Sequence, residues 1–152
     1  MARLKSLVIH LKQGDIMNTR EYLGRVRRFD KMIETRLEEI ERLRTMATNI
    51  SPKYSEDKVQ TSFSNDKIGV IIAEIAEKED EVRSIVRQKG TIIAQIEGID
   101  DFLEYVVLTD KYVKGLQYKE IAGDIERTER HTMKIHDRAI ANFEIKYAKF
   151  IK

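Results

Sequence analysis

The chain has 152 residues, a formal net charge of +2 at pH 7 and 36% charged residues. It contains no cysteine, which excludes disulfide bonds, thiol catalysis and zinc sites built on cysteine. Its apolar runs, such as residues 70–73, are far shorter than the ~20 residues that cross a bilayer. One proline and seven glycines favour long helices. The composition therefore predicts an all-α, cytoplasmic protein without a membrane span.

Residues 1–16 are open to two interpretations. The spacing of an amphipathic helix is shown by Leu4, Leu7, Val8 and Leu11. The Gln-Gly-Asp sequence that shortly precedes Met17 can, however, be encoded by a ribosome-binding sequence in front of a start codon. We therefore expect residues 1–16 to be a translated leader or a disordered N-terminus, with the helix as the competing interpretation.

Residues 17–97 are predicted to form a long antiparallel helical hairpin. Its first helix is expected to run from Asn18, which forms a capping-box pattern with Glu21, to about Ala47. Apolar residues repeat every three or four positions along this helix and predict its inward stripe. They are Tyr22, Val26, Phe29, Ile33, Leu37, Ile40, Leu43 and Ala47.

A loop and a second helix complete the expected hairpin. The loop is predicted at residues 49–64, where Pro52 and four serines interrupt the apolar pattern. The helix is predicted at about residues 65–95. At ~1.5 Å per residue each helix is about 45 Å long, so the two can fold back on each other. The expected inward stripe of the second helix comprises Ile68, Ile72, Ile75, Val82, Val86, Ile93 and Ile96.

Three further isoleucines, Ile71, Ile85 and Ile92, lie beside that stripe. Two helices provide only a seam, so these side chains predict a third surface from another copy or another protein. We therefore expect a homo-oligomer, with a dimer favoured, assembled through the hairpin. The alternative is that these isoleucines merely widen the seam.

Residues 98–152 are predicted to be a second domain. Gly98 marks a break before a helix expected at residues 99–114, which Gly115 ends. The apolar residues of that helix are expected to pack beneath the segment that follows. They are Phe102, Leu103, Val106, Val107 and Tyr112.

Residues 117–136 have the pattern of a helix-turn-helix. A short helix is expected to bury Ile121, Ala122 and Ile125, with the small Ala122 where the two helices cross. Thr128 then opens a second helix and can cap it by accepting a hydrogen bond from a backbone N–H of the first turn, that of Arg130 or His131. The apolar stripe of the second helix continues through Ile135, Ala139, Ile140 and Phe143.

The run of residues 118–143 resembles region four of bacterial sigma factors, the module that reads the minus-35 element of promoters. It matches that module without a gap. The resemblance implies base contacts from Glu129, Arg130 and Lys134, and places His131 and Met133 near phosphates. A carboxylate can accept from cytosine N4, and an arginine can pair with guanine O6 and N7.

This sequence departs from the sigma pattern at three positions. Glu126 replaces the usual turn glycine, and Arg127 replaces the small apolar residue after it. A residue other than glycine in a left-handed turn costs about 1 kcal/mol, so a different turn geometry is one expectation. Thr132 stands where valine or isoleucine is usual.

A wider resemblance covers residues 17–143, which are similar to small phage and prophage proteins described as ArpU- or RinA-type regulators of late genes. It implies a transcriptional regulator that binds double-stranded DNA. Because one such module has a small footprint and few positive charges, we expect a dimer on two half-sites or a partner such as RNA polymerase. Residues 128–152 hold six basic and three acidic residues. The phosphate contacts that we expect are Arg127, Thr128, His131, Arg138 and Lys146.

Catalytic and cofactor patterns are missing from the sequence. His131 and His136 lie five residues apart, about 140° around a helix, which argues against a shared metal. Phosphate loops and nucleophile elbows do not occur. We therefore predict a non-enzymatic protein without a cofactor or metal.

Three alternatives to a DNA-reading regulator remain. In the first, the sigma-like module docks on RNA polymerase or a phage partner without reading DNA. In the second, the hairpin builds a structural or DNA-packaging ring. In the third, residues 102–143 are a generic helical bundle.

Overall fold

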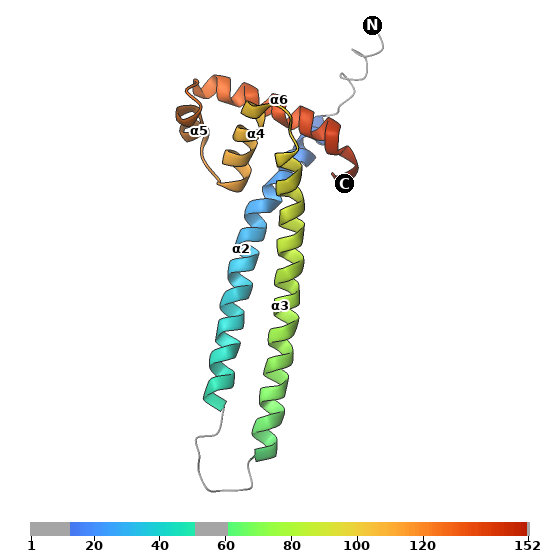
Figure 1. Cartoon of the computed structure of the whole chain (residues 1–152), viewed down its shortest axis with the longest axis vertical. Helices are drawn as coiled ribbons and strands as arrows, with labels where there is room; N and C mark the ends of the chain where they lie inside the picture. Colours follow the sequence, from blue (N-terminus) through green and yellow to red (C-terminus); the bar gives the residue numbers. More distant parts are fainter. Residues whose placement is uncertain (1–12, 51–60, 152) are drawn as a thin grey trace. The chain divides into compact units, whose positions relative to one another are not determined.

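The computed structural model describes residues 13–50 and 61–151, with side chains from Thr19 and from Asn65 onward (Figure 1). Over these residues the regular structure is entirely helical, which confirms the predicted all-α class. The elements are α2 (Gln13–Ile50), α3 (Thr61–Glu97), α4 (Phe102–Leu108), the π-helical turn η1 (Thr109–Val113), α5 (Tyr118–Asp124), α6 (Glu129–Tyr147) and the 3-10 turn η2 (Ala148–Phe150).

Two helix boundaries differ from the prediction. Because α2 already begins at Gln13, Asn18 lies inside the helix and the predicted capping box is wrong. The helix α3 begins at Thr61, since no glycine or proline interrupts the chain between this residue and position 65. Most of the expected leader and most of the expected loop lie outside the described residues.

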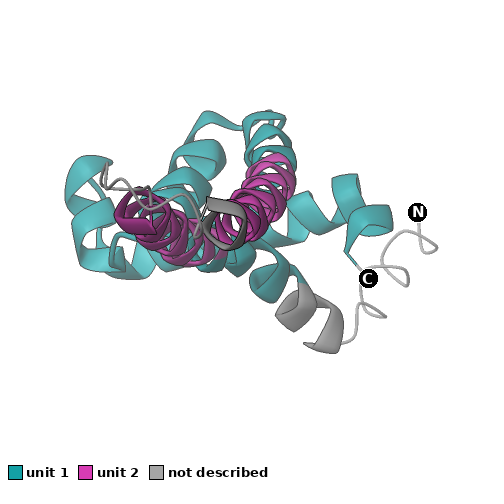
Figure 2. Ribbon diagram, turned by 90° about the horizontal axis from the view of Figure 1, so that it is seen from below, with its two compact units in different colours: residues 1–28, 89–152 teal, residues 29–88 magenta. Residues whose placement is uncertain are grey.

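The chain divides into two compact units, each built from parts of both long helices (Figure 2). Unit 1 comprises residues 1–28 and 89–152, and unit 2 comprises residues 29–88. The sequence predicts a division between residues 97 and 98. The ends of the long helices instead pack with the C-terminal elements, as shown by the 6.2 Å between the ring centroids of Tyr22 and Phe143.

In unit 2, α2 and α3 lie side by side and antiparallel. Ion pairs between described residues link them. Glu81 and Lys78 of α3 lie 2.7 and 3.1 Å from Arg36 and Glu39 of α2, respectively. Glu79 lies 2.9 Å from Arg44. From Arg36–Glu81 to Glu39–Lys78 the residue number rises on α2 and falls on α3, as antiparallel packing requires.

The inward residues of α3 correct the predicted stripe. Ile71 and Ile85 are buried, whereas Ile72 and Val86 are 57% and 50% exposed. Inward positions alternate between spacings of three and four residues, the 3.5-residue period of coiled coils. The prediction missed this phase because a lysine occupies one inward position. The series in unit 2 is Ile68, Ile71, Ile75, Lys78, Val82 and Ile85.

The stripe of α2 needs the same correction at one position. Leu37 is 52% exposed, and Arg36 takes the inward position beside it. In addition, Ile71, Ile85 and Ile92 are covered by the chain itself. These three isoleucines therefore do not form the surface for self-association that the sequence predicts.

Unit 1 packs α4, α5 and α6 around a common core. Val107, Ile121 and Ile135 form its centre, and α6 adds the fully buried Ile140 and Phe143. The predicted start of the α4 helix at residue 99 is wrong by three residues. Asp101 is the N-cap, and its carboxylate accepts a hydrogen bond from the Glu104 backbone N–H at 3.0 Å. Phe102 is 73% exposed and does not pack beneath the following helices as expected.

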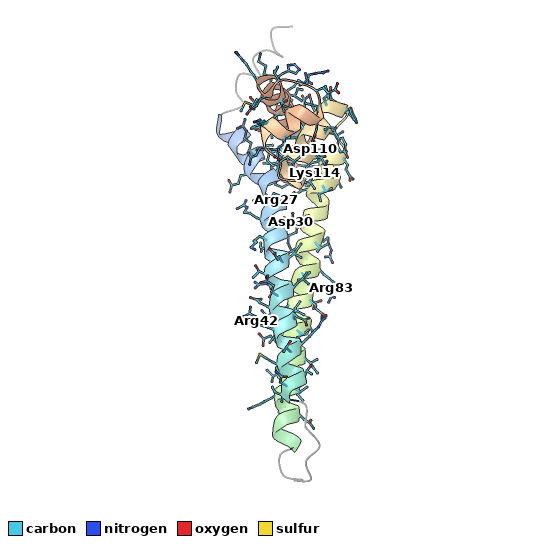
Figure 3. All side chains as sticks on the ribbon, turned by 90° about the vertical axis from the view of Figure 1, so that its left-hand side faces the viewer. Arg27, Asp30, Arg42, Arg83, Asp110 and Lys114 are labelled. Carbon is cyan, nitrogen blue, oxygen red and sulfur yellow. The ribbon has the colours of Figure 1, made fainter. Side chains whose placement is uncertain are left out.

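Gly115 ends the α4–η1 segment as predicted, and the structure shows why glycine suits this position. Its φ angle is +74°, in the left-handed region that glycine adopts without cost. A Cβ atom here would also lie 2.9 Å from Nε of Arg27 on α2. Figure 3 labels Arg27 together with Asp110 and Lys114, whose side chains form a 2.7 Å ion pair.

No helix in the described part of the chain combines the length and apolar character needed to span a membrane.

Candidate nucleic-acid interface

The turn between α5 and α6 is fixed by backbone hydrogen bonds. The N–H of Arg127 donates to the Ala122 carbonyl at 2.9 Å, and the N–H of Ile125 donates to the Ile121 carbonyl at 3.0 Å. Glu126 lies between them with a φ of +53°. It therefore adopts, with a Cβ atom, the left-handed conformation that glycine favours.

The start of α6 is capped as the sequence predicts. Thr128 is the N-cap, and its hydroxyl accepts a hydrogen bond from the His131 backbone N–H at 3.1 Å. Thr132 is fully buried on α6. Its hydroxyl donates to the Thr128 carbonyl at 3.0 Å, so a threonine is accommodated at this apolar position without an unsatisfied group.

The core below the turn positions α6. Ala122 and Ile121 are buried on α5, and Ile135, Ala139 and Ile140 are buried on α6. These residues lock one stripe of α6 inward. The opposite stripe near the start of α6 is therefore held rigidly at the surface.

The three predicted base-contacting residues lie on that exposed stripe. Glu129, Arg130 and Lys134 are all exposed. Their side chains take part in no hydrogen bond or ion pair with the residues that the structure describes. Arg127 and His131 are exposed beside them. The first half of α6 thus presents cations and one carboxylate that remain available to a ligand.

The other predicted phosphate contacts are engaged within the chain. Arg138 donates from Nε to the buried carboxylate of Glu104 at 2.5 Å. Lys146 donates to the Gly98 carbonyl and lies 3.6 Å from Asp100. Both cations therefore brace α6 against the segment around the start of α4.

His136 is a buried structural residue that the sequence analysis did not identify. The Nε2 atom of His136 lies 2.8 Å from the Tyr112 hydroxyl, and its Nδ1 atom lies 3.3 Å from Asp137. Burial lowers the pKa of His136, and burial raises the pKa of Tyr112 and of Tyr118. The spacing of four residues that separates His136 from both Thr132 and Ile140 could have predicted that His136 faces inward on α6.

Asp137 also connects α6 to α2. Its carboxylate lies 2.7 Å from Nη2 of Arg20. Asp137 is thus bonded on two sides, to His136 and to Arg20, and lies two turns after Arg130 on the same side of α6. Within the described ranges, no group of three or more histidine and acidic side chains could hold a metal ion.

Comparisons of the chain with protein-family models, curated proteins and solved structures found no match.

Proposed function

We propose that α5 and α6 form a sigma region 4-like helix-turn-helix and that the protein is a phage-type transcriptional regulator of double-stranded DNA. One observation carries the proposal. Arg130 and Lys134 lie one turn apart on the exposed stripe of α6 without a partner among the described residues, whereas Arg138 and Lys146 are engaged within the chain. A surface cation that no internal group engages is available to bases or phosphates.

The proposed contacts follow from the geometry of α6. The cap at Thr128 fixes the start of the helix, and the first turns of a recognition helix enter the major groove. Arg130 pairs with a guanine edge, Glu129 accepts from cytosine N4, and Lys134 reads a second acceptor. Arg127 and His131 hold the flanking phosphates. We assign no phosphate to Arg138 or Lys146, because each would first have to leave its partner.

A single module of this size should bind weakly and with strong salt dependence. Each neutralised phosphate contributes a slope of about −0.9 to the dependence of log K on log salt concentration. Specific affinity then requires two copies on two half-sites, or RNA polymerase as a partner. In this proposal α2 and α3 form the hairpin that assembles the copies, and the protein works in the cytoplasm without an enzymatic activity.

Fluorescence anisotropy tests the proposal, with promoter duplexes from the surrounding genome at about 50 and 200 mM salt. The variant is Arg130→Ala/Lys134→Ala. The matched control, Arg42→Ala/Lys67→Ala, removes one arginine and one lysine from exposed positions of α2 and α3. Each base contact provides about 1–3 kcal/mol, so the α6 variant should lose at least tenfold in affinity and the control should bind like the wild type.

Two results would overturn DNA reading by α6: no binding at low salt, or equal losses in the variant and the control.

A second candidate function is supported by a different observation. In unit 1, Phe102 and Tyr105 line an open hollow of about 310 Å³ with Glu97 and Asp100. This surface favours docking on a protein partner such as RNA polymerase, and capture of that partner should be unaffected by Arg130→Ala/Lys134→Ala.

A further inference from the structure

The two flanks of the α2–α3 pair in unit 2 differ in character. One flank carries the ion cluster of Arg36, Glu39, Lys78 and Glu81. The opposite flank, which we call the apolar flank, is formed by residues that each follow an inward position by one. It comprises Asp30, Leu37 and Arg44 on α2 and Ile72, Glu79 and Val86 on α3.

Contacts and spacing place these six residues on one side. Leu37, Arg44 and Glu79 line a single open hollow of about 330 Å³. Ile72 and Val86 lie seven residues on either side of Glu79, and Asp30 lies seven residues before Leu37. Seven residues are two turns of a coiled-coil helix, so each set forms a straight row. Figure 3 shows the side chains along the two helices, with Asp30 labelled on α2.

The apolar side chains of the apolar flank are exposed to solvent. Its three apolar side chains, Leu37, Ile72 and Val86, are each at least half exposed. Each helix thus has an apolar stripe that is wider than its inward positions alone. Such a wide stripe is typical of helices in a bundle with more than two members. The pair formed by α2 and α3 therefore lacks a layer on this flank.

The order of residues along the flank is self-complementary. On α2 the row reads Asp30, Leu37, Arg44, and a two-fold axis at Leu37 brings Asp30 of one copy opposite Arg44 of the other. On α3 the same axis places Ile72 opposite Val86. Opposite charges thus meet on one helix and apolar side chains meet on the other, as an isologous interface requires.

We propose that a second copy of this chain covers the apolar flank, so that two α2–α3 pairs form an antiparallel four-helix bundle with Leu37 of both copies on the two-fold axis. Glu79 lies at the same level on α3. Its carboxylate is 2.9 Å from Arg44 of its own chain, which offsets the repulsion between the two Glu79 residues. With both signs of charge in the row, the flank has no excess positive charge to attract a polyanion such as DNA.

Cysteine cross-linking tests the two-fold axis directly, because the natural chain has no cysteine. In Leu37→Cys the two thiols face each other within reach of a disulfide, whose Cα atoms lie about 4.4–6.8 Å apart. The matched control is Val70→Cys, a more exposed apolar position two residues away from Ile72 and off the row. Oxidation of the full chain at low micromolar concentration without DNA should convert most of Leu37→Cys, and little of Val70→Cys, to a covalent dimer.

A mixture of two single variants tests the register. Ile72→Cys with Val86→Cys should cross-link as a heterodimer, whereas neither variant should cross-link alone. Light scattering of the wild type should give twice the 17.8 kDa chain mass. The proposal is overturned by a monomer, by a larger ring, by equal cross-linking of Leu37→Cys and Val70→Cys, or by efficient cross-linking of Ile72→Cys alone. Since DNA is absent, failure of DNA reading would not change any of these results.

Discussion

The Nε atom of Arg138 lies 2.5 Å from Oε1 of Glu104, whose carboxylate is almost completely buried between α4 and α6. The amide of Asn142 donates to both oxygens of the same carboxylate at 3.0 and 2.9 Å. A buried carboxylate needs such partners, because burial of an unpaired charge is strongly unfavourable. The helix α6 is therefore held to α4 by charge as well as by apolar packing.

Arg138→Ala should destabilise unit 1 without removing a DNA contact. The substitution leaves the Glu104 carboxylate buried with Asn142 as its remaining side-chain donor, which should lower the free energy of unfolding by about 1–3 kcal/mol. Urea denaturation measures this change. Arg130→Ala is the control, and at this exposed position the change should stay within about 0.5 kcal/mol. An Arg138→Ala protein of wild-type stability that binds DNA poorly would show that Arg138 contacts phosphate instead.

The sequence predicted the features of unit 1 that depend on neighbouring residues. The cap at Thr128 and the break at Gly115 depend on residues within one turn of each other. The buried stripe of α6 depends on a single helical period, which Ile135 and Ile140 already display. These features could be predicted because their physical causes lie within short stretches of the chain.

The features that were missed depend on distant partners. Lys78 occupies an inward position because Glu39, on the other helix, binds its ammonium group. Glu104 is buried because Arg138 comes to it from α6. A pattern search that admits only apolar residues must skip Lys78, and it then assigns Ile72 to the interior. Charged residues inside a helical seam become predictable only when both helices are aligned.

Thr128→Ala should remove the cap of α6. The His131 backbone N–H would lose the hydroxyl to which it donates at 3.1 Å, and such caps contribute about 1 kcal/mol to stability. Thermal unfolding of Thr128→Ala and Thr128→Ser checks this. The serine variant keeps the acceptor and should stay close to the wild type, so equal losses in both variants would mean that the hydroxyl does not cap the helix.

Glu126→Gly should stabilise the turn. Glu126 has a φ of +53°, which costs a residue with a Cβ about 1 kcal/mol and costs glycine almost nothing. Glycine also loses more entropy on folding, so the net gain should be about 0.5 kcal/mol. The comparison is with Glu126→Ala, which removes the same carboxylate but keeps the Cβ. If the alanine variant were as stable as the glycine variant, the backbone strain at this turn would be negligible.

The stability of unit 1 should decrease as the pH falls below about 6.5, the ordinary pKa of histidine. Burial lowers the pKa of His136 in the folded protein. As the pH falls, this histidine therefore binds its proton in the unfolded chain at a higher pH than in the folded protein. The stability is therefore complete above the unfolded pKa and is lost as the pH falls toward the folded pKa. For one proton the slope is at most about 1.4 kcal/mol per pH unit.

Urea denaturation at pH 7.5, 6.5 and 5.5 measures this slope. His136→Gln keeps a side chain that can bond to the Tyr112 hydroxyl but cannot titrate, so its stability should vary less with pH. His131 is exposed and lies outside the buried contacts of His136, so His131→Gln is the control and should retain the wild-type slope. The same slope in the His136→Gln protein would show that another group is responsible for the acid sensitivity.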